Sequence, residues 1–211
     1  MKVWSDSFAD GAPIPSDNAF AKHHPTDHVE LCPNRSPHVA WSDVPAEAKS
    51  LVLVVHDPDV PSKPDDVNQE GKTVPADLPR VDFHHWGLAD IRPDMDALAA
   101  GEFSDGVTPR GKDGPGAPRG LRQAINDYTG WFEGDDDMEG TYFGYDGPCP
   151  PWNDSIVHHY HFTLYALDVT RAPIDGEFTV ADLVTALEGH VVEKASFMGT
   201  YTINPDAEDK G

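Results

Sequence analysis

The chain has 211 residues, and its 37 Asp and Glu against 15 Lys and Arg give a formal net charge of −22. The length suits one domain over residues 1–211 with a substantial core. The charge argues against sequence-independent binding to nucleic acids or anionic lipid surfaces, because their phosphates would meet a repulsive field.

The first predicted elements lead into the centre of a sheet. A short helix is expected over Asp43–Lys49. Leu51–Val55 is a continuous apolar run rich in β-branched residues, which predicts a buried central strand. The segment 56–61 that follows contains two prolines, which cannot donate to a ladder, so we expect a turn there.

The middle of the chain alternates a strand with irregular segments. Val81–Ala89 is the next predicted strand, and Asp94–Ala100 is predicted to form one or two helical turns. Asp105–Gly147 is rich in Gly, Asp and Pro, and a loop of that length is often functional. We expect a surface excursion that is pinned by its aromatic side chains. These are Tyr128, Trp131, Phe132, Tyr142, Phe143 and Tyr145.

The clearest strand pattern lies in Ser155–Leu167. Side chains alternate between the two faces of a strand, so His158 and Tyr160 are expected on one face and His159 on the other.

The last elements are a helix and a short strand. Thr179 opens a T-x-x-D capping box, and an apolar stripe of helical spacing that reaches Val191 follows it. Met198–Tyr201 is predicted as a short strand or loop. Many strands and few helices predict a mainly β domain.

Several motifs together resemble the phosphatidylethanolamine-binding protein family, which includes the Raf kinase inhibitor proteins, and most closely its bacterial and archaeal branch. The resemblance covers roughly residues 32–201. The matching stretches are Asn34–Trp41 (family N-x-S-P-x-x-x-W), Asp57–Pro61 (D-P-D-A-P), His85–Trp86, Asn126–Tyr128, Gly144–Pro151 (G-Y-x-G-P-C-P-P), His158–Asp168 and Gly199–Tyr201.

The resemblance implies a central antiparallel sheet packed on a smaller sheet, with peripheral helices. It also implies a small pocket at one end of the sheet that takes phosphate, phosphorylethanolamine-like headgroups, acetate or similar anions. On this basis we expect a binding protein that needs no catalytic residue, metal or cofactor. The pocket wall carried over from the family consists of Asp57, Pro61, Phe83, His85, Pro150, Pro151, His158 and Tyr160.

Two features depart from the family pattern. His159 stands where the family has an Arg, although strand alternation directs it away from the pocket face. The segments Ser62–Pro79 and Asp105–Gly120 are longer than is typical of the family.

The predicted wall has a coherent chemistry. Two imidazoles and a phenol can donate to anion oxygens, and a carboxylate can orient an imidazole or meet a ligand ammonium group. Prolines and aromatic rings exclude water and strengthen those hydrogen bonds. With an ordinary imidazole pKa of about 6.5, affinity for phosphate is expected to fall between about pH 5.5 and 8.

Simpler roles compete for the same residue types. Asp57 could merely cap its turn, and His84 and His161 are expected on the other strand faces in core or surface roles. A solvated loop or a metal site could explain a further cluster, formed by His23, His24 and His28. Cys32 and Cys149 match no C-x-x-C spacing and are interpreted as buried free thiols, with a disulfide as the alternative.

Two other functional classes stay open. A phosphoester or ester hydrolase could use Asp57, His85 and His158 as an acid–base set, or Cys149 as a nucleophile paired with His158. No G-x-S-x-G, H-E-x-x-H or paired-cysteine zinc motif supports this. Eleven histidines with abundant Asp could instead form a transition-metal site.

The composition also suggests an environment. The chain has 27 Asp against 10 Glu and only 8 Lys, which is typical of adaptation to concentrated salt, where self-repulsion is screened. An ordinary acidic cytosolic protein is the alternative. Neither a secretory signal nor a long apolar run is visible, so we expect a soluble, cytoplasmic protein. A homodimer and a protein partner of unknown identity are further expectations.

Overall fold

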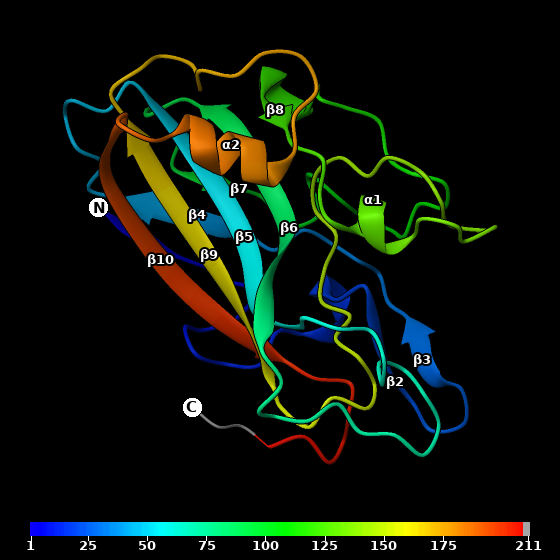
Figure 1. Cartoon of the computed structure of the whole chain (residues 1–211). Coiled ribbons are helices and arrows are strands. Elements are labelled where there is room, and N and C mark those ends of the chain that lie inside the picture. The colour runs from blue at the N-terminus through cyan, green and yellow to red at the C-terminus, as the bar shows by residue number, and fades with distance from the viewer. Residues whose placement is uncertain (209–211) are drawn as a thin grey trace.

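Strands dominate the computed structural model, which describes residues 1–208 (Figure 1). The central sheet is antiparallel, in the order β10-β9-β5-β6-β8. Its strands are β5 (Ser50–Pro61), β6 (Arg80–Ile91), β8 (Arg122–Gln123), β9 (His158–Leu167) and β10 (Val191–Tyr201). A smaller sheet has the order β1-β4-β7, and a hairpin forms a third unit. These strands are β1 (Lys2–Trp4), β4 (Val39–Ser42), β7 (Ala97–Leu98), β2 (Ala21–His24) and β3 (His28–Leu31).

Helices are short and lie at the periphery. They are η1 (Ser16–Asn18), η2 (Pro118–Gly120), α1 (Tyr128–Trp131) and α2 (Val180–Ala186). Within residues 1–208, no helix is long and apolar enough to cross a membrane. The prediction of a mainly β fold with a central and a smaller sheet and peripheral helices is confirmed.

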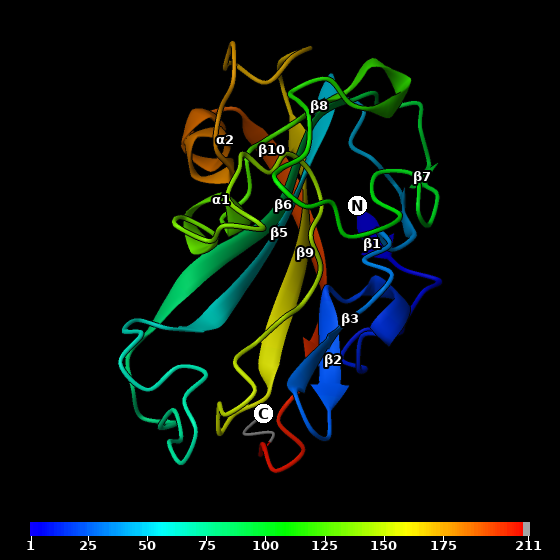
Figure 2. The same ribbon diagram turned by 90° about the vertical axis from the view of Figure 1, so that its right-hand side faces the viewer.

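β5 is apolar on both faces because both faces are covered. Leu51, Leu53 and Val55 pack into the main core with residues of the smaller sheet. Val52 and Val54 belong to a second core with residues of α2. Figure 2 shows this layering, with α2 on one side of the central sheet and β1 and β7 on the other. The continuous apolar run that predicted a buried strand therefore fills two cores.

The predicted turn at 56–61 is wrong, because β5 continues to Pro61. The register between β5 and β6 shifts between Val55 and His56 and again between Asp57 and Val60. Pairing of β5 with β9 ends at His56, so beyond it the strand pairs with β6 alone. A proline without an N–H is tolerated where one side of a strand has no partner.

Two predicted helices are absent from the described structure. Asp43 takes a left-handed φ of 55°, and the segment 43–49 forms only a turn. Residues 97 and 98, inside the predicted helix Asp94–Ala100, pair instead with Val39 and Ala40 of β4 and bury Leu98 completely. Tertiary pairing overrides a weak helical preference here.

The predicted capping box is confirmed. The hydroxyl of Thr179 accepts from the backbone N–H of Asp182, and the carboxylate of Asp182 accepts from the backbone N–H of Thr179. The helix ends earlier than the apolar stripe, because Gly189 adopts a left-handed φ of 81° and β10 begins at Val191. The short terminal strand expected at 198–201 is thus the end of a strand of 11 residues.

The excursion at 105–147 is partly ordered into η2, β8 and α1. Its aromatic anchors behave as expected except Trp131, which is 51% exposed, and Phe132, which is partly buried. The N-terminal histidine cluster is not a plain loop, because His23, His24 and His28 lie on the β2–β3 hairpin.

Candidate functional site

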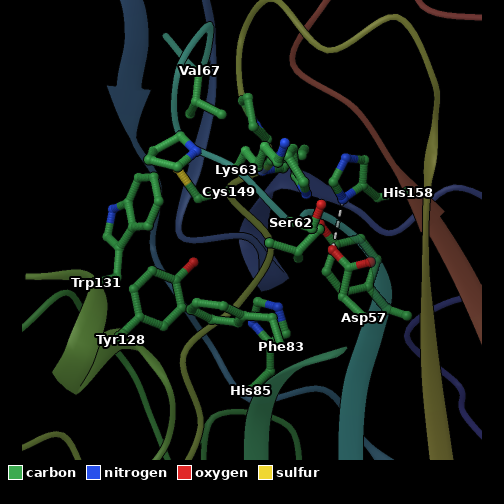
Figure 3. Close-up of a pocket in the computed structure, with 16 residues that line it drawn as sticks. Asp57, Ser62, Lys63, Val67, Phe83, His85, Tyr128, Trp131, Cys149 and His158 are labelled. Carbon is green, nitrogen blue, oxygen red and sulfur yellow. Dashed lines mark hydrogen bonds and ion pairs between the residues drawn. The ribbon is translucent and has the colours of Figure 1, made fainter. Parts of the chain in front are cut away.

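A cavity of about 140 Å³ opens at the end of the central sheet where β5, β6 and β9 approach α1 (Figure 3). All eight residues of the predicted wall line it: Asp57, Pro61, Phe83, His85, Pro150, Pro151, His158 and Tyr160. Further lining residues were not predicted: Val60, Ser62, Lys63, Pro64, Val67, Tyr128, Trp131 and Cys149. Segments that are distant in the sequence therefore meet around one hollow.

His158 lies between two carboxylates. Its Nδ1 is 2.7 Å from Oδ2 of Asp57 and its Nε2 is 3.1 Å from Oδ2 of Asp154. All three side chains are almost fully buried. Each ring nitrogen faces an acceptor, so both carry a proton and the ring is an imidazolium.

The His158 ring keeps its positive charge at neutral pH. Burial alone would lower the pKa of His158, but the two carboxylates outweigh it and raise the pKa to about 9. Asp154 is held in turn by Arg80, through a bond of 2.5 Å from Nη1 to Oδ2 and one of 3.1 Å from Nη2 to Oδ1. The buried cluster of Asp57, Asp154, His158 and Arg80 thus pairs two negative with two positive groups.

Asp57 both faces the cavity and shapes the strand. Its Oδ2 accepts from His158, and its Oδ1 accepts from the backbone N–H of Asp59 at 2.8 Å. The second bond is the turn-capping role considered from sequence, here at the irregular part of β5. The carboxylate therefore acts as an acceptor toward every hydrogen-bond partner described.

The second pocket histidine has a different state. Nδ1 of His85 lies 2.8 Å from the carbonyl oxygen of Asp146, so the proton is on Nδ1 and Nε2 carries a lone pair. Burial lowers the pKa of His85 and outweighs the nearby carboxylates, which keeps the ring neutral at neutral pH. The two histidines thus differ in charge, and the expected loss of imidazolium between pH 5.5 and 8 does not apply to either.

Two phenols complete the polar part of the wall. Burial, followed by the charge of Asp57 and a hydrogen bond to that carboxylate, raises the pKa of Tyr160 well above its ordinary value. Burial does the same for Tyr128, whose hydroxyl donates to the carbonyl of Gly147 at 2.7 Å. Both groups keep their protons at neutral pH, so Tyr160 can serve as a donor.

The rim is apolar with one cation. Phe83 stands against Tyr128 edge to face with ring centroids 5.2 Å apart, and the half-exposed Trp131 borders the opening. Lys63 is exposed, lines the cavity and makes no ion pair within the described residues 1–208. Its ammonium group is positioned to attract an anion to the opening.

The geometry disfavours His158 as a general base and Cys149 as a nucleophile, two roles considered from sequence. His158 has no free ring nitrogen with which to accept a proton. Burial raises the pKa of the Cys149 thiol to about 12, so the nucleophilic thiolate is scarce at neutral pH. Cys32 and Cys149 are free thiols. Among residues 1–208, no group of three or more His, Cys, Asp or Glu could hold a metal ion.

Histidines on the other strand faces do not line the cavity, in agreement with the alternation argument. Nδ1 of His159, which replaces the family Arg, lies 2.8 Å from Oδ2 of Asp59, within hydrogen-bond distance. His84, His56 and His161 lie side by side across β6, β5 and β9, with ring centroids 6.4 and 5.3 Å apart.

Sequence patterns offered little that could have identified Asp154 and Arg80. Asp154 precedes His158 by four residues in an irregular segment, and Arg80 is 74 residues away from it. Only one sequence feature pointed to Lys63 as a site residue: it lies in the insertion that follows the Asp57–Pro61 motif.

Comparisons with known proteins show which proteins the chain is similar to. A family model described as phosphatidylethanolamine-binding protein matches residues 4–202, which reaches further toward the N-terminus than the stretch expected from motifs. A UPF0098 protein of Methanothermobacter thermautotrophicus is 36% identical over 168 residues, covering 80% of this chain and 83% of that protein. A UPF0098 protein of Chlamydia trachomatis is 33% identical over 201 residues, covering 95% and 98%.

Solved structures are similar over nearly the whole chain. A phosphatidylethanolamine-binding protein homologue from Chlamydia trachomatis has a TM-score of 0.63 at 30% identity and covers 95% of each chain. YbcL of Escherichia coli has a TM-score of 0.67 at 24% identity, covering 96% of this chain and 98% of that one, and this likeness concerns the fold.

Proposed function

The chain belongs to the phosphatidylethanolamine-binding protein family, and on that premise we propose that its cavity binds small anions, namely phosphate, phosphorylethanolamine-like headgroups and acetate. One observation carries the proposal. A protonated phenol, an imidazolium between carboxylates and a neutral imidazole border a single hollow with an apolar rim. Such a mixture of a few fixed polar groups in an apolar wall is typical of small-ligand sites.

Charge balance determines how an anion would be held. The buried cluster beside the cavity is neutral, because the imidazolium and Arg80 offset Asp57 and Asp154. A bound anion therefore depends on directed hydrogen bonds, with Tyr160 as a donor, and on the ammonium of Lys63 at the opening. In a chain of charge −22, dissolved salt favours this short-range recognition by screening the surrounding repulsion.

Titration calorimetry with phosphate, phosphorylethanolamine and acetate tests the proposal. Tyr160→Phe removes one hydroxyl and keeps the ring, so phosphate affinity should fall by roughly ten- to a hundredfold, as expected for a hydrogen bond to a charged group. Tyr165→Phe is the matched control, because Tyr165 lies on the same strand and packs against the core on the α2 side. Equal affinities in the two variants, or no binding by the unaltered protein, would contradict the proposal.

Further proposals concern context. We propose that the protein is cytoplasmic. From its excess of Asp over Glu and Lys, we also propose that it is adapted to concentrated salt. Unfolding free energy should then rise steeply between about 0.1 and 1 M KCl, beyond what a protein of balanced charge shows.

Regulation of a protein partner in the manner of the Raf kinase inhibitor proteins, and assembly as a homodimer, are proposals that rest on the family alone. Light scattering of the purified protein tests the dimer, and a mass corresponding to 23.0 kDa would contradict it.

A further inference from the structure

We propose that Lys112 is a positioning residue of the cavity: its buried ion pair with Asp146 holds the His85 ring in place, although neither charged group lines the hollow. The effect on ligand binding rests on the proposed function, whereas the effect on the ring can be measured without a ligand. The motif G-Y-x-G-P-C-P-P leaves position 146 open, and Lys112 lies in the segment 105–120, which departs from the family pattern. The motif alone therefore does not predict this pairing.

The backbone of Asp146 holds His85 through two hydrogen bonds. Its carbonyl oxygen accepts from Nδ1 of His85 at 2.8 Å, and its N–H donates to the carbonyl oxygen of His85 at 3.1 Å. The first bond keeps the ring proton on Nδ1 and leaves Nε2 as an acceptor. Because both bonds come from one residue, a displacement of Asp146 reaches the His85 ring directly.

The side chain of Asp146 is completely buried and has three donors around it. Nδ2 of Asn34 lies 2.8 Å from Oδ1, Nδ2 of Asn126 lies 2.7 Å from Oδ2, and Nζ of Lys112 lies 2.7 Å from the same Oδ2. The two amides are neutral, and within residues 1–208 Lys112 is the only cation that pairs with this carboxylate. A buried carboxylate without a cation is strongly destabilised, so the position of Asp146 depends on Lys112.

Lys112 is itself fixed in the structure. Its backbone N–H donates to the carbonyl of Thr141 at 2.9 Å, and its carbonyl accepts from the N–H of Phe143 at 3.3 Å. Its Nζ also donates to the carbonyl of Tyr145. Burial lowers the pKa of Lys112, and the adjacent carboxylate of Asp146 opposes that shift and favours the charged ammonium. The cation therefore reaches the carboxylate in one defined geometry, as a positioning group requires.

His85 forms part of the cavity wall (Figure 3), so its orientation decides what the wall offers to a ligand. In the observed arrangement Nε2 can accept from an O–H of phosphate or from the ammonium group of phosphorylethanolamine. A ring that turns, or that moves its proton to Nε2, presents a donor at that point instead. Loss of the Lys112 charge thus changes the hydrogen-bonding role of His85 as well as its position.

NMR of the histidine ring nitrogens in the ligand-free protein tests this positioning. The unaltered protein should show one protonated and one unprotonated nitrogen for His85. Lys112→Met keeps a side chain of similar length without the charge, so the two nitrogen signals should move toward each other, as they do when both tautomers are populated. Calorimetry with phosphate should show an affinity about tenfold lower in this variant, which is the effect of losing one hydrogen bond.

Arg122→Met is the matched control. Arg122 pairs with Asp90 at 2.5 Å, the side chains are 12% and 16% exposed, and neither residue lines the cavity. This variant should also lower the free energy of unfolding, but it should leave the His85 signals and the phosphate affinity unchanged. If Lys112→Met does not fold, Lys112→Gln takes its place, because it keeps an N–H donor near Asp146 and should move the His85 signals in the same direction by less.

Four outcomes separate this inference from the alternatives. Unchanged His85 signals in the Lys112 variant would overturn it, even if phosphate binding weakens. Equal changes of those signals in Arg122→Met would overturn it too, since they would reflect a general loosening of the fold. Failure of both Lys112 variants to fold, with Arg122→Met folded, would assign the ion pair to stability and overturn the positioning role. If the signals move only in the Lys112 variant while the unaltered protein binds no phosphate, the positioning is supported and the proposed function fails.

Discussion

The guanidinium of Arg80 donates two hydrogen bonds to the carboxylate of Asp154, and Oδ2 of that carboxylate lies 3.1 Å from Nε2 of His158. Arg80 also donates to the backbone carbonyls of Asp59 and Pro75, each at 2.8 Å. One guanidinium thereby joins the start of β6, the irregular end of β5 and the loop before β9. The pocket histidine is held in place by a residue that does not line the cavity.

Arg80→Ala should therefore be strongly destabilising. The substitution removes one of the positive partners of the Asp154 carboxylate, whose side chain is 1% exposed. Breaking a buried ion pair in this way lowers the free energy of unfolding by about 3–5 kcal/mol. Urea unfolding measures the change. Arg92→Ala removes an arginine from a surface pair whose side chains are 73% and 74% exposed, so it should cost less than about 1 kcal/mol. Equal effects of the two substitutions would contradict this account of Arg80.

His158 predicts a decline of stability in alkali. Its pKa is about 9 in the folded protein against 6.5 for an ordinary histidine, so the folded state binds the proton more tightly. The resulting stabilisation, roughly 3 kcal/mol, is complete below about pH 6.5 and is lost as the pH rises toward about 9. An NMR titration of the His158 ring should have its midpoint near pH 9. A midpoint below pH 7 would show that the ring is not paired with both carboxylates.

Lys63 should contribute to phosphate binding through its charge. Lys63→Gln is expected to weaken binding roughly two- to fivefold at about 0.1 M salt, and the loss should disappear near 1 M, where the Debye length is about 3 Å. Lys72→Gln is the control, since Lys72 lies in the same insertion, pairs with Asp66 at 3.5 Å and does not line the cavity. A loss of the same size in both variants, or one that persists in concentrated salt, would argue against this role.

Because Gly147 has no side chain, its backbone packs closely against the backbone of Asn18, and this contact holds the proline-rich wall in place. A Cβ at this position would lie 2.2 Å from the backbone oxygen of Asn18, and the carbonyl of Gly147 accepts from Tyr128. Gly147→Ala should cost about 1–3 kcal/mol or more and weaken phosphate binding. At Gly130, in α1, no atom would lie within 4 Å of an added Cβ, so Gly130→Ala should leave both properties nearly unchanged. Urea unfolding and phosphate titration of both variants measure the two properties, and equal effects of the two substitutions would contradict this role of Gly147.

Periodicity predicted long strands of the central sheet, and the family resemblance predicted eight of the residues that line the cavity. Alternation correctly separated His158 and Tyr160 from His159, because a strand directs neighbouring side chains to opposite faces. The capping box at Thr179 was equally readable, since its hydrogen bonds are local in sequence.

Features that depend on distant partners could not be predicted. Leu98 lies in a segment of helical composition but pairs with Val39, which no local pattern records. The charge state of His158 depends on Asp154, and the protonated nitrogen of His85 is set by the carbonyl of Asp146. No recognisable sequence motif links either histidine to its partner. The expected loss of imidazolium between pH 5.5 and 8 therefore does not occur at either histidine, because burial lowers the pKa of His85 and the carboxylates raise the pKa of His158.

A crystal of the protein soaked in phosphate near pH 6 and solved at high salt would test the binding claim most directly. We expect phosphate density inside the cavity, with an oxygen within about 3.2 Å of the Tyr160 hydroxyl. Ordered water alone in the cavity, with phosphate bound elsewhere on the protein, would contradict it.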